Sequence, residues 1–203
     1  MNWFTADPHF GHQALLNFNL ERTVHFSHID AWDRYVLKMI NDYVVKGDRL
    51  FILGDFTCGA DPAKYRNQIK KGQIYLIRGN HDKSDQRCKQ VFGKMNVRDT
   101  FIAKCCNIPI FLSHYAHAYW PGSHKNHFHA YGHTHAQRES TLNFIWPERR
   151  SLDVGLDNAM RVLGEFRPFS EDDIFTLLGN KKGHDDVDFY KNFNKAIERY
   201  ESA

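Results

Sequence analysis

The sequence has few cysteines, no long apolar run and no block of charge of one sign. It contains only four cysteines, Cys58, Cys88, Cys105 and Cys106, and no two of them form a Cys-x-x-Cys pair. This spacing argues against a zinc site built from thiolates, and we expect all four thiols to be reduced and structural. No apolar stretch approaches the roughly 18 residues that a membrane helix needs, and no signal peptide is evident. We therefore expect a cytoplasmic protein without a membrane partner.

Charge is nearly balanced, whereas histidine is abundant. The 27 basic and 24 acidic residues give a formal net charge of +3, without the Lys and Arg clusters typical of a nucleic-acid surface. Histidine occurs 13 times, and seven of these residues lie between His114 and His135. Because histidine is the commonest metal ligand, this concentration suggests a metal site. The length of 203 residues suits one compact domain with a sizeable core.

Short apolar runs alternate with amphipathic stretches along the chain. Strands are predicted over residues 3–6, 49–53, 73–77, 108–112, 127–131, 141–146 and 151–156. Helical spacing predicts helices over residues 13–18, 30–44, 61–69, 84–92 and 172–178, followed by an amphipathic helix over residues 189–200. Early alternation and then a run of strands indicate an α/β layered sandwich with mixed sheets.

Residue types at three helix starts support these boundaries. Asp30 is a candidate N-cap, Asp61-Pro62 predicts an N-cap followed by a first-turn proline, and Ser170 with Asp173 predicts a capping box. We expect one domain over residues 1–180. Residues 181–203 would form a linker and a helix that packs either on this domain or on a second copy, which leaves monomer and homodimer both open.

Five short polar motifs each follow one of the predicted strands. They are Asp7-Pro8-His9, Gly54-Asp55, Gly79-Asn80-His81-Asp82, His114 and Gly132-His133-Thr134-His135. Each alone could be a simple turn, but together they predict a metal site, because open α/β sheets bind ligands where their strands end. Side chains two apart on a strand point the same way, so Asp7 and His9 can reach one ion. Oxygen and imidazole donors without thiolates suit Mn²⁺, Fe or Zn²⁺.

Taken together, these motifs make the sequence resemble the calcineurin-like metallophosphoesterase superfamily over residues 2–178. The opening stretch from Trp3 to His12 is similar to the small bacterial and phage members, as are residues 152–157 and 167–170. The resemblance implies a four-layer α/β/β/α sandwich, in which two mixed β-sheets are flanked by helices and a dinuclear metal site lies at the C-terminal ends of the strands.

The resemblance also implies the ligand set and the chemistry. Asp7, His9 and His135 would hold the first metal, Asn80, His114 and His133 the second, and Asp55 would be shared by both. His81 would steady the transition state or protonate the leaving oxygen, and Asp82 would orient it. A hydroxide that bridges the metals would attack phosphorus in line. The cofactors would be two divalent ions, with Mn²⁺ favoured and Fe, Zn²⁺ or Ni²⁺ as alternatives.

Substrate contacts are less clearly indicated by the sequence. The candidates are Asn80, Arg78, Tyr115 and His117, although an arginine just before a glycine turn also suits a structural salt bridge. His12 could lie near the pocket or on the surface, and we expect His129 to be packed within its strand.

We expect a phosphoesterase, with a phosphodiester favoured over a monoester. Asn-His-Asp followed by Gly-His-Thr-His is more similar to the phosphodiesterase and nuclease branches of the superfamily. The favoured substrate is a small phosphate ester of nucleotide type. One alternative is a small nuclease that acts on DNA or RNA, whose affinity would fall steeply with salt. Another is a non-catalytic protein-binding scaffold, which would be expected to lack metal ligands.

Overall fold

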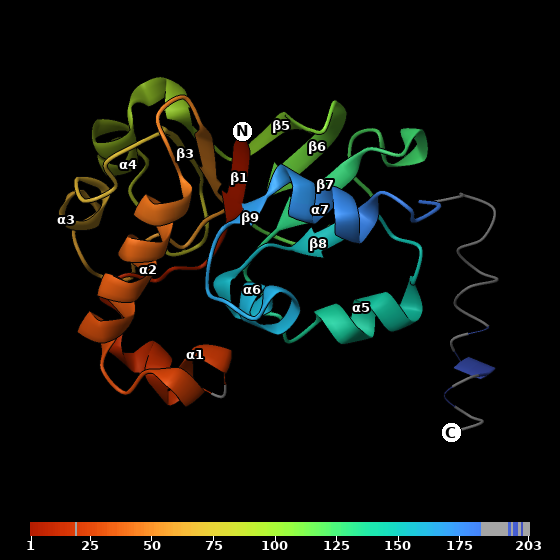
Figure 1. Cartoon of the computed structure of the whole chain (residues 1–203), viewed down its shortest axis with the longest axis horizontal. Coiled ribbons are helices and arrows are strands. Elements are labelled where there is room, and N and C mark those ends of the chain that lie inside the picture. Colours follow the sequence, from red (N-terminus) through yellow and green to blue (C-terminus); the bar gives the residue numbers. More distant parts are fainter. Residues whose placement is uncertain (19, 184–194, 196, 199, 201–203) are drawn as a thin grey trace.

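Two β-sheets form the centre of the structure, a computed structural model that describes residues 1–18, 20–183, 195, 197–198 and 200. The strands are β1 (Asn2–Thr5), β2 (Arg49–Ile52), β3 (Gln73–Ile77), β4 (Val97–Arg98), β5 (Thr100–Cys105), β6 (Ile108–Ser113), β7 (Phe128–Tyr131), β8 (Ser151–Asp153) and β9 (Phe169–Ser170). The first sheet has the order β4-β3-β2-β1-β9 and the second β5-β6-β7-β8 (Figure 1).

Both sheets are mixed, as predicted. Strands β1 to β4 pair in parallel, and β9 runs antiparallel to β1. In the second sheet β5 is antiparallel to β6, whereas β6, β7 and β8 are parallel. The C-terminal ends of β1, β2 and β3, and likewise those of β6 and β7, therefore lie next to one another.

Helices flank the sheets (Figure 1). They are η1 (Gln13–Asn17), α1 (Glu21–His25), α2 (Ile29–Tyr43), α3 (Pro62–Arg66), α4 (Asp85–Phe92), η2 (Lys94–Asn96), η3 (Ser123–Lys125), α5 (Glu139–Ile145), α6 (Leu156–Leu163) and α7 (Glu171–Leu178). Among the described residues, none of these helices is long and apolar enough to cross a bilayer.

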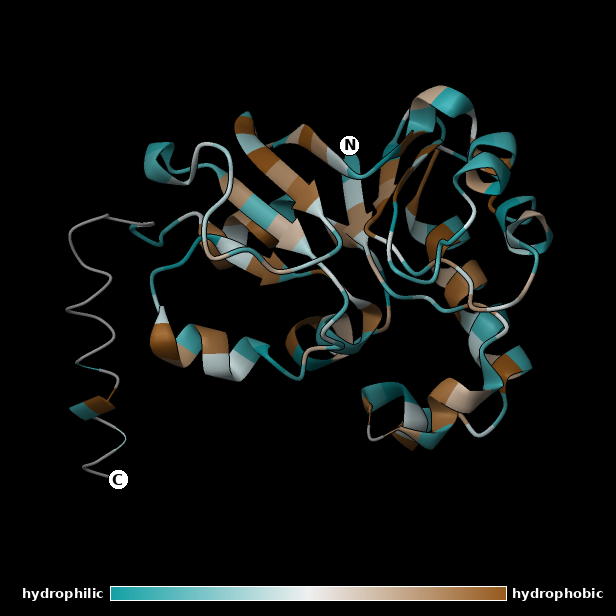
Figure 2. Cartoon of the chain, turned by 180° about the vertical axis from the view of Figure 1, so that it is seen from behind, coloured by the Kyte–Doolittle hydropathy of each residue, from teal (hydrophilic) through white to brown (hydrophobic). Residues whose placement is uncertain are grey.

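Alternation along the strands separates two hydrophobic cores. Leu50 and Ile52 of β2 face outward and pack with Val36 of α2, whereas Phe51 points between the sheets and packs with Leu112 of β6. Figure 2 shows the hydrophobic residues concentrated on the strands of both sheets, with hydrophilic residues on the connecting loops. The sandwich is thus held by one core between the sheets and another beneath the flanking helices.

Two of the three predicted helix starts are confirmed. The side chain of Asp61 accepts a hydrogen bond from the amide of Ala63, and Ser170 and Asp173 form the reciprocal capping box. The third start is shifted, since α2 begins at Ile29 and Asp30 lies in its first turn. Helix α3 also ends at residue 66, before the predicted residue 69.

Two predictions after β7 are wrong. Residues 141–146 were expected to be a strand, but most of them lie in helix α5. Leu142 and Trp146, four apart, line the same small pocket, so the apolar spacing there is that of a helix. The strand expected over residues 151–156 ends at Asp153, and Leu156 begins helix α6.

Other elements had no clear signal in the sequence. The patterns did not predict β4, β5, α1 or α6. Strand β5 pairs with the next strand along the chain, β6, whereas β4 pairs with β3, and α1 is joined to α6 by the contact between Arg22 and Asp157. The amphipathic helix expected over residues 189–200 lies outside the described residues apart from a few isolated positions.

Candidate metal centre

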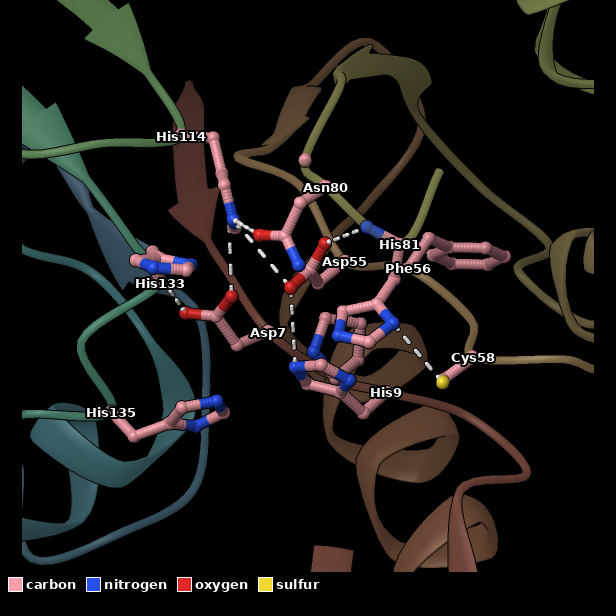
Figure 3. Close-up of polar contacts among 12 residues, drawn as sticks. Asp7, His9, Asp55, Phe56, Cys58, Asn80, His81, His114, His133 and His135 are labelled. Carbon is pink, nitrogen blue, oxygen red and sulfur yellow. Dashed lines mark hydrogen bonds and ion pairs between the residues drawn. The ribbon is translucent and has the colours of Figure 1, made fainter. Parts of the chain in front are cut away.

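Five loops converge at one edge of the two sheets (Figure 3). They follow β1, β2 and β3 of the first sheet and β6 and β7 of the second, and each carries one of the polar motifs. Backbone hydrogen bonds join neighbouring loops: the amide of Asp7 donates to the carbonyl of Gly54 at 3.1 Å, and the amide of Gly132 donates to the carbonyl of His114 at 2.9 Å. The topology therefore brings together motifs that are far apart in the sequence.

Among the described residues, three overlapping groups of three side chains could each hold a cation. The first consists of Asp7, His9 and His135, the second of Asp55, His114 and His133, and the third of His9, Asp55 and His81. Within each group the donor atoms lie within 4.8 Å of one another. Apart from Asn80 and the sharing of Asp55, the first two groups are the sets that the family resemblance assigned to a first and a second metal.

Asp55 lies between the first two groups. Its Oδ2 is 3.5 Å from His9 Nε2 and 3.5 Å from His114 Nε2. The Asn80 Oδ1 oxygen is 3.0 Å from the same His114 nitrogen. All seven residues predicted as ligands thus come together, and the position of Asp55 suits a carboxylate shared by two ions.

The backbone of the ligand loops differs from the prediction. Asp7, His9, Asp55, His133 and His135 all have positive φ angles, between 48° and 69°. They are left-handed rather than extended, so the alternation of a strand does not explain why their side chains converge. A non-glycine residue held in this region costs about 1–3 kcal/mol. Hydrogen bonds between the loops hold these residues in that conformation, among them one of 3.0 Å from the His9 amide to the Asp55 carbonyl.

Two glycines allow the loops to approach closely. A Cβ atom at Gly54 would lie 2.3 Å from His114 Nδ1, and one at Gly79 would lie 2.3 Å from Asp55 Oδ1. Both distances are well inside van der Waals contact. The glycines of these two motifs are therefore needed for room next to the ligands, and at Gly54 also for a φ of +91°.

Unpaired polar atoms show that the donor set fits a cation. Asp7 Oδ1 and both ring nitrogens of His9 are buried without a hydrogen-bond partner. Buried polar atoms are nearly always paired, so such a cluster points to a ligand that these atoms share. Carboxylate, amide and imidazole donors together suit a transition metal such as Mn²⁺, Fe or Zn²⁺.

Burial and mutual contact shift the pKa values of four candidate ligands. Burial raises the pKa of Asp7 to about 7 and lowers the pKa of His9 to about 2. Burial opposes the charged forms of Asp55 and His114, but their mutual contact outweighs it. The pKa of Asp55 therefore falls to about 2, and the pKa of His114 rises to about 9. A cation would have to displace the protons on Asp7 and His114.

A buried ion pair supports His135. His135 Nδ1 is 2.9 Å from Asp157 Oδ2, and Asp157 in turn accepts a hydrogen bond of 2.6 Å from Arg22 Nη2. Burial alone would raise the pKa of Asp157, but Arg22 and His135 hold that pKa well below its usual range. Arg22 also donates to the Asp7 carbonyl at 2.9 Å and so ties two ligands to one positioning network.

Asp153 supports the loop after β7, which carries His133 and His135. Its carboxylate accepts hydrogen bonds from the Thr134 hydroxyl at 2.6 Å, the Ala136 amide at 3.0 Å and the Gly155 amide at 2.7 Å. The sequence reasoning did not assign a role to Asp153, Asp157 or Arg22. The two aspartates lie in the stretch 152–157 that resembles the family, whereas no motif surrounds Arg22.

The structure gives Asp82 a different role from the one expected. Its carboxylate accepts hydrogen bonds from the backbone amides of Asp55, Phe56 and Gly79 at 2.8, 3.1 and 2.9 Å, so it holds two ligand loops together. The contact of the His81 ring is instead with Cys58, whose Sγ lies 3.1 Å from His81 Nδ1 (Figure 3). Burial raises the pKa of the Cys58 thiol, which favours a neutral donor there.

Two of the predicted substrate contacts lie elsewhere. Arg78 pairs with Asp99 at 2.5 Å and with Asp85 at 3.5 Å, and it lines a different pocket, so the structural salt bridge is the correct alternative. His117 packs against Phe111 on the outer face of the second sheet, with ring centroids 5.5 Å apart. Both positions are set by tertiary packing that the loop sequence does not reveal.

Tyr115 and His12 both lie beside the candidate ligands, but only His12 lines the cavity over them, so a substrate contact by Tyr115 stays a prediction. The Tyr115 hydroxyl is 3.4 Å from Asn80 Oδ1, and its ring packs against His133 with centroids 4.6 Å apart. His12 lies near the centre, with its ring centroid 5.5 Å from that of His9. His129 is fully buried in β7 between two serine hydroxyls, as expected. All four cysteines are free.

A cavity of about 340 Å³ opens over the centre. Its polar lining consists of His9, His12, Asp55, Asn80, His81, His133, His135 and Gln137. Its apolar lining consists of Ala14, Leu15, Phe18 and Leu20. The candidate ligands therefore face a space large enough for a small organic molecule.

Comparison with known proteins identifies one family. The family model described as calcineurin-like phosphoesterase matches residues 3–200. An uncharacterized protein of Methanocaldococcus jannaschii is 24% identical over 187 residues, which cover 89% of this chain and 92% of that protein.

Two solved structures are similar to this chain to different degrees. A protein of unknown function from Aquifex aeolicus has a TM-score of 0.68 and 25% identity, covering 88% of this chain and 99% of that chain. A novel archaeal phosphodiesterase has a TM-score of 0.42 and 19% identity, covering 66% of this chain and 73% of that chain. This second likeness is too slight to carry a conclusion about the present protein.

Proposed function

This chain belongs to the calcineurin-like phosphoesterase family, and from that membership we propose that it is a dinuclear metal-dependent phosphodiesterase acting on nucleotides or similar small esters. Membership makes it a metal-dependent phosphoesterase; the two metals and the diester preference are our proposal. The observation that supports it most directly is the pair of three-residue donor groups with Asp55 between them.

The two groups would hold one divalent cation each. Asp7, His9 and His135 would bind the first, Asn80, His114 and His133 the second, and Asp55 both. Bound there, two cations would lower the pKa of water and offset the negative charge of a phosphoryl group. Oxygen and imidazole donors without a thiolate suit Mn²⁺, Fe and Zn²⁺ alike, and among these we propose Mn²⁺ from the resemblance of the motifs to the family.

Besides the cations, His81 is the side chain that we propose to act in catalysis. It lines the cavity, and its backbone amide donates to Asp55 Oδ1 at 2.8 Å, which fixes its loop against the centre. If the Cys58 thiol donates to Nδ1, the imidazole proton resides on Nε2. In this neutral state the ring can donate a hydrogen bond from Nε2 to an oxygen on which negative charge develops. To protonate a leaving oxygen, the ring would first have to take up a second proton at Nδ1, and general acid catalysis by the resulting imidazolium contributes about 10²–10⁴-fold.

The diester preference follows from the motifs and agrees with the size of the site. A cavity of about 340 Å³ exceeds the space that one phosphate group needs, so both ester groups of a small diester could be accommodated. The polar lining carries imidazoles and one shared carboxylate but no lysine or arginine. The two negative charges of a monoester would therefore have to be neutralised by the cations alone, whereas a diester carries only one negative charge that needs neutralising.

Hydrolysis assays on manganese-loaded protein test this proposal. The panel contains bis-p-nitrophenyl phosphate, p-nitrophenyl phosphate, a cyclic nucleotide, a dinucleotide and single-stranded DNA. We expect turnover of diesters at a higher kcat/KM than of monoesters, and no turnover by Asp55→Asn, which should remain folded by circular dichroism. Full activity in folded Asp55→Asn, or binding of only one metal per chain, would contradict the dinuclear mechanism.

A further inference from the structure

One side of the cavity over the metal centre is apolar. It consists of Ala14, Leu15, Phe18 and Leu20, which we call the apolar wall. These residues lie close together in the sequence, in and after η1. A phosphoryl group would be held by the polar side of the cavity and would gain nothing from contact with this apolar surface. The wall is therefore free to contact another part of the same ligand.

The wall is fixed in position relative to the ligand loops. Leu15 and Leu20 are buried and form its base. Directly after Leu20, helix α1 carries Arg22, which is fully buried and bonded to Asp157 and to the Asp7 carbonyl. The base of the wall therefore lies beside an anchor on the loop that carries Asp7, and a surface that is already in place reduces the entropic cost of binding.

Phe18 is the exposed part of the wall. Its side chain retains 58% of its accessible surface, although it lines the cavity. An exposed phenyl ring offers no hydrogen bond, but it gains from contact with a flat apolar surface and from ring stacking. None of the four described side chains of the wall offers a hydrogen bond to a sugar hydroxyl or to a second charged group.

We propose that the apolar wall binds an aromatic ring carried by the phosphate ester, either a nucleobase or another aryl group, and that Phe18 determines specificity for it. The inference rests on the proposed function, since it assumes that a phosphoryl group occupies the polar side. Stacking of one base on an aromatic side chain changes affinity by about five- to a hundredfold on alanine substitution.

Calorimetric titration of manganese-loaded protein separates the ring from the anion. The probes are methylphosphonate, phenylphosphonate and thymidine 5′-monophosphate, none of which requires turnover. We expect the two ring-bearing anions to bind at least about tenfold more tightly than methylphosphonate. Phe18→Ala should remove most of this preference and leave the affinity for methylphosphonate within about twofold, while Phe18→Trp should retain it.

Phe144→Ala provides a matched control. Phe144 lies in α5, is 45% exposed and does not line the cavity, so its loss should leave all three affinities unchanged. Equal binding of methylphosphonate and phenylphosphonate, or a preference that survives Phe18→Ala, would overturn the inference and leave the proposed function intact. Failure of all three anions to bind the metal-loaded protein would refute the proposed function itself, and the inference with it.

Discussion

The buried pair of Arg22 and Asp157 gives a prediction with two separate readouts. Both side chains are fully buried, and Asp157 Oδ2 contacts Arg22 Nη2 at 2.6 Å and His135 Nδ1 at 2.9 Å. Asp157→Asn keeps the shape but removes the negative charge, so the Arg22 charge loses its ionic partner. Breaking one partner of a buried pair costs about 3–5 kcal/mol. Because Arg22 keeps its hydrogen bond to the Asp7 carbonyl, we expect the lower end, about 3 kcal/mol.

The second readout is the metal. Loss of a carboxylate that orients a ligating histidine weakens metal affinity about 10–100-fold. Since Asp157 contacts only His135 among the proposed ligands, one Mn²⁺ should bind more weakly and the other unchanged. The assays are urea unfolding of metal-free protein and calorimetric titration with Mn²⁺. Asp42→Asn is the control, because Asp42 pairs with Lys38 on the exposed surface of α2, where such a pair contributes little to stability, and is remote from the candidate ligands.

The stability that Asp157 contributes should depend on pH in a definite direction. The pKa of Asp157 is lowered by folding, so its contribution to stability should be complete above about pH 4, the ordinary value, and lost as pH falls further. The difference in unfolding free energy between wild type and Asp157→Asn should therefore shrink in acid. Equal stability of the two proteins at pH 7, together with unchanged affinity for both ions, would refute this account of the pair.

Three further predictions concern the centre itself. His81→Ala should keep both metals by elemental analysis but lose about 10²–10⁴-fold in kcat, most with poor leaving groups; loss of a metal would show that His81 is a ligand. Burial raises the pKa of Asp7 to about 7, and contact with Asp55 raises the pKa of His114 to about 9. The affinity for Mn²⁺, measured by calorimetry, should therefore rise with pH through this interval, and binding should release protons. An affinity flat between pH 6 and 9 would contradict it. Gly79→Ala should crowd Asp55 Oδ1 at 2.3 Å, destabilise the fold by about 1–3 kcal/mol and weaken metal binding; unchanged melting and metal content would show that the loop can yield.

The residue types and the resemblance of the sequence to a known family predicted a set of metal ligands and a layered α/β fold. Asp7, His9, Asp55, His114 and the other predicted ligands were recognisable because a metal site needs particular donor atoms, and donor chemistry is a property of residue type. Apolar periodicity and capping act over a few residues, so they made part of the elements recognisable, namely strands β1, β2, β3, β6, β7 and β8 and helices η1, α2, α3, α4 and α7. Those short-range signals are present in the linear chain and needed no knowledge of distant contacts.

Only the tertiary structure decided how these residues meet and what supports them. Five of the seven predicted ligands converge through left-handed backbone rather than strand alternation, because contacts between loops outweigh local preference. Asp82 binds backbone amides instead of His81, Arg78 is paired away from the cavity, and Arg22 reaches Asp157 across 135 positions of the chain. Each of these outcomes depends on the packing of segments far apart in sequence, which periodicity and residue type do not encode.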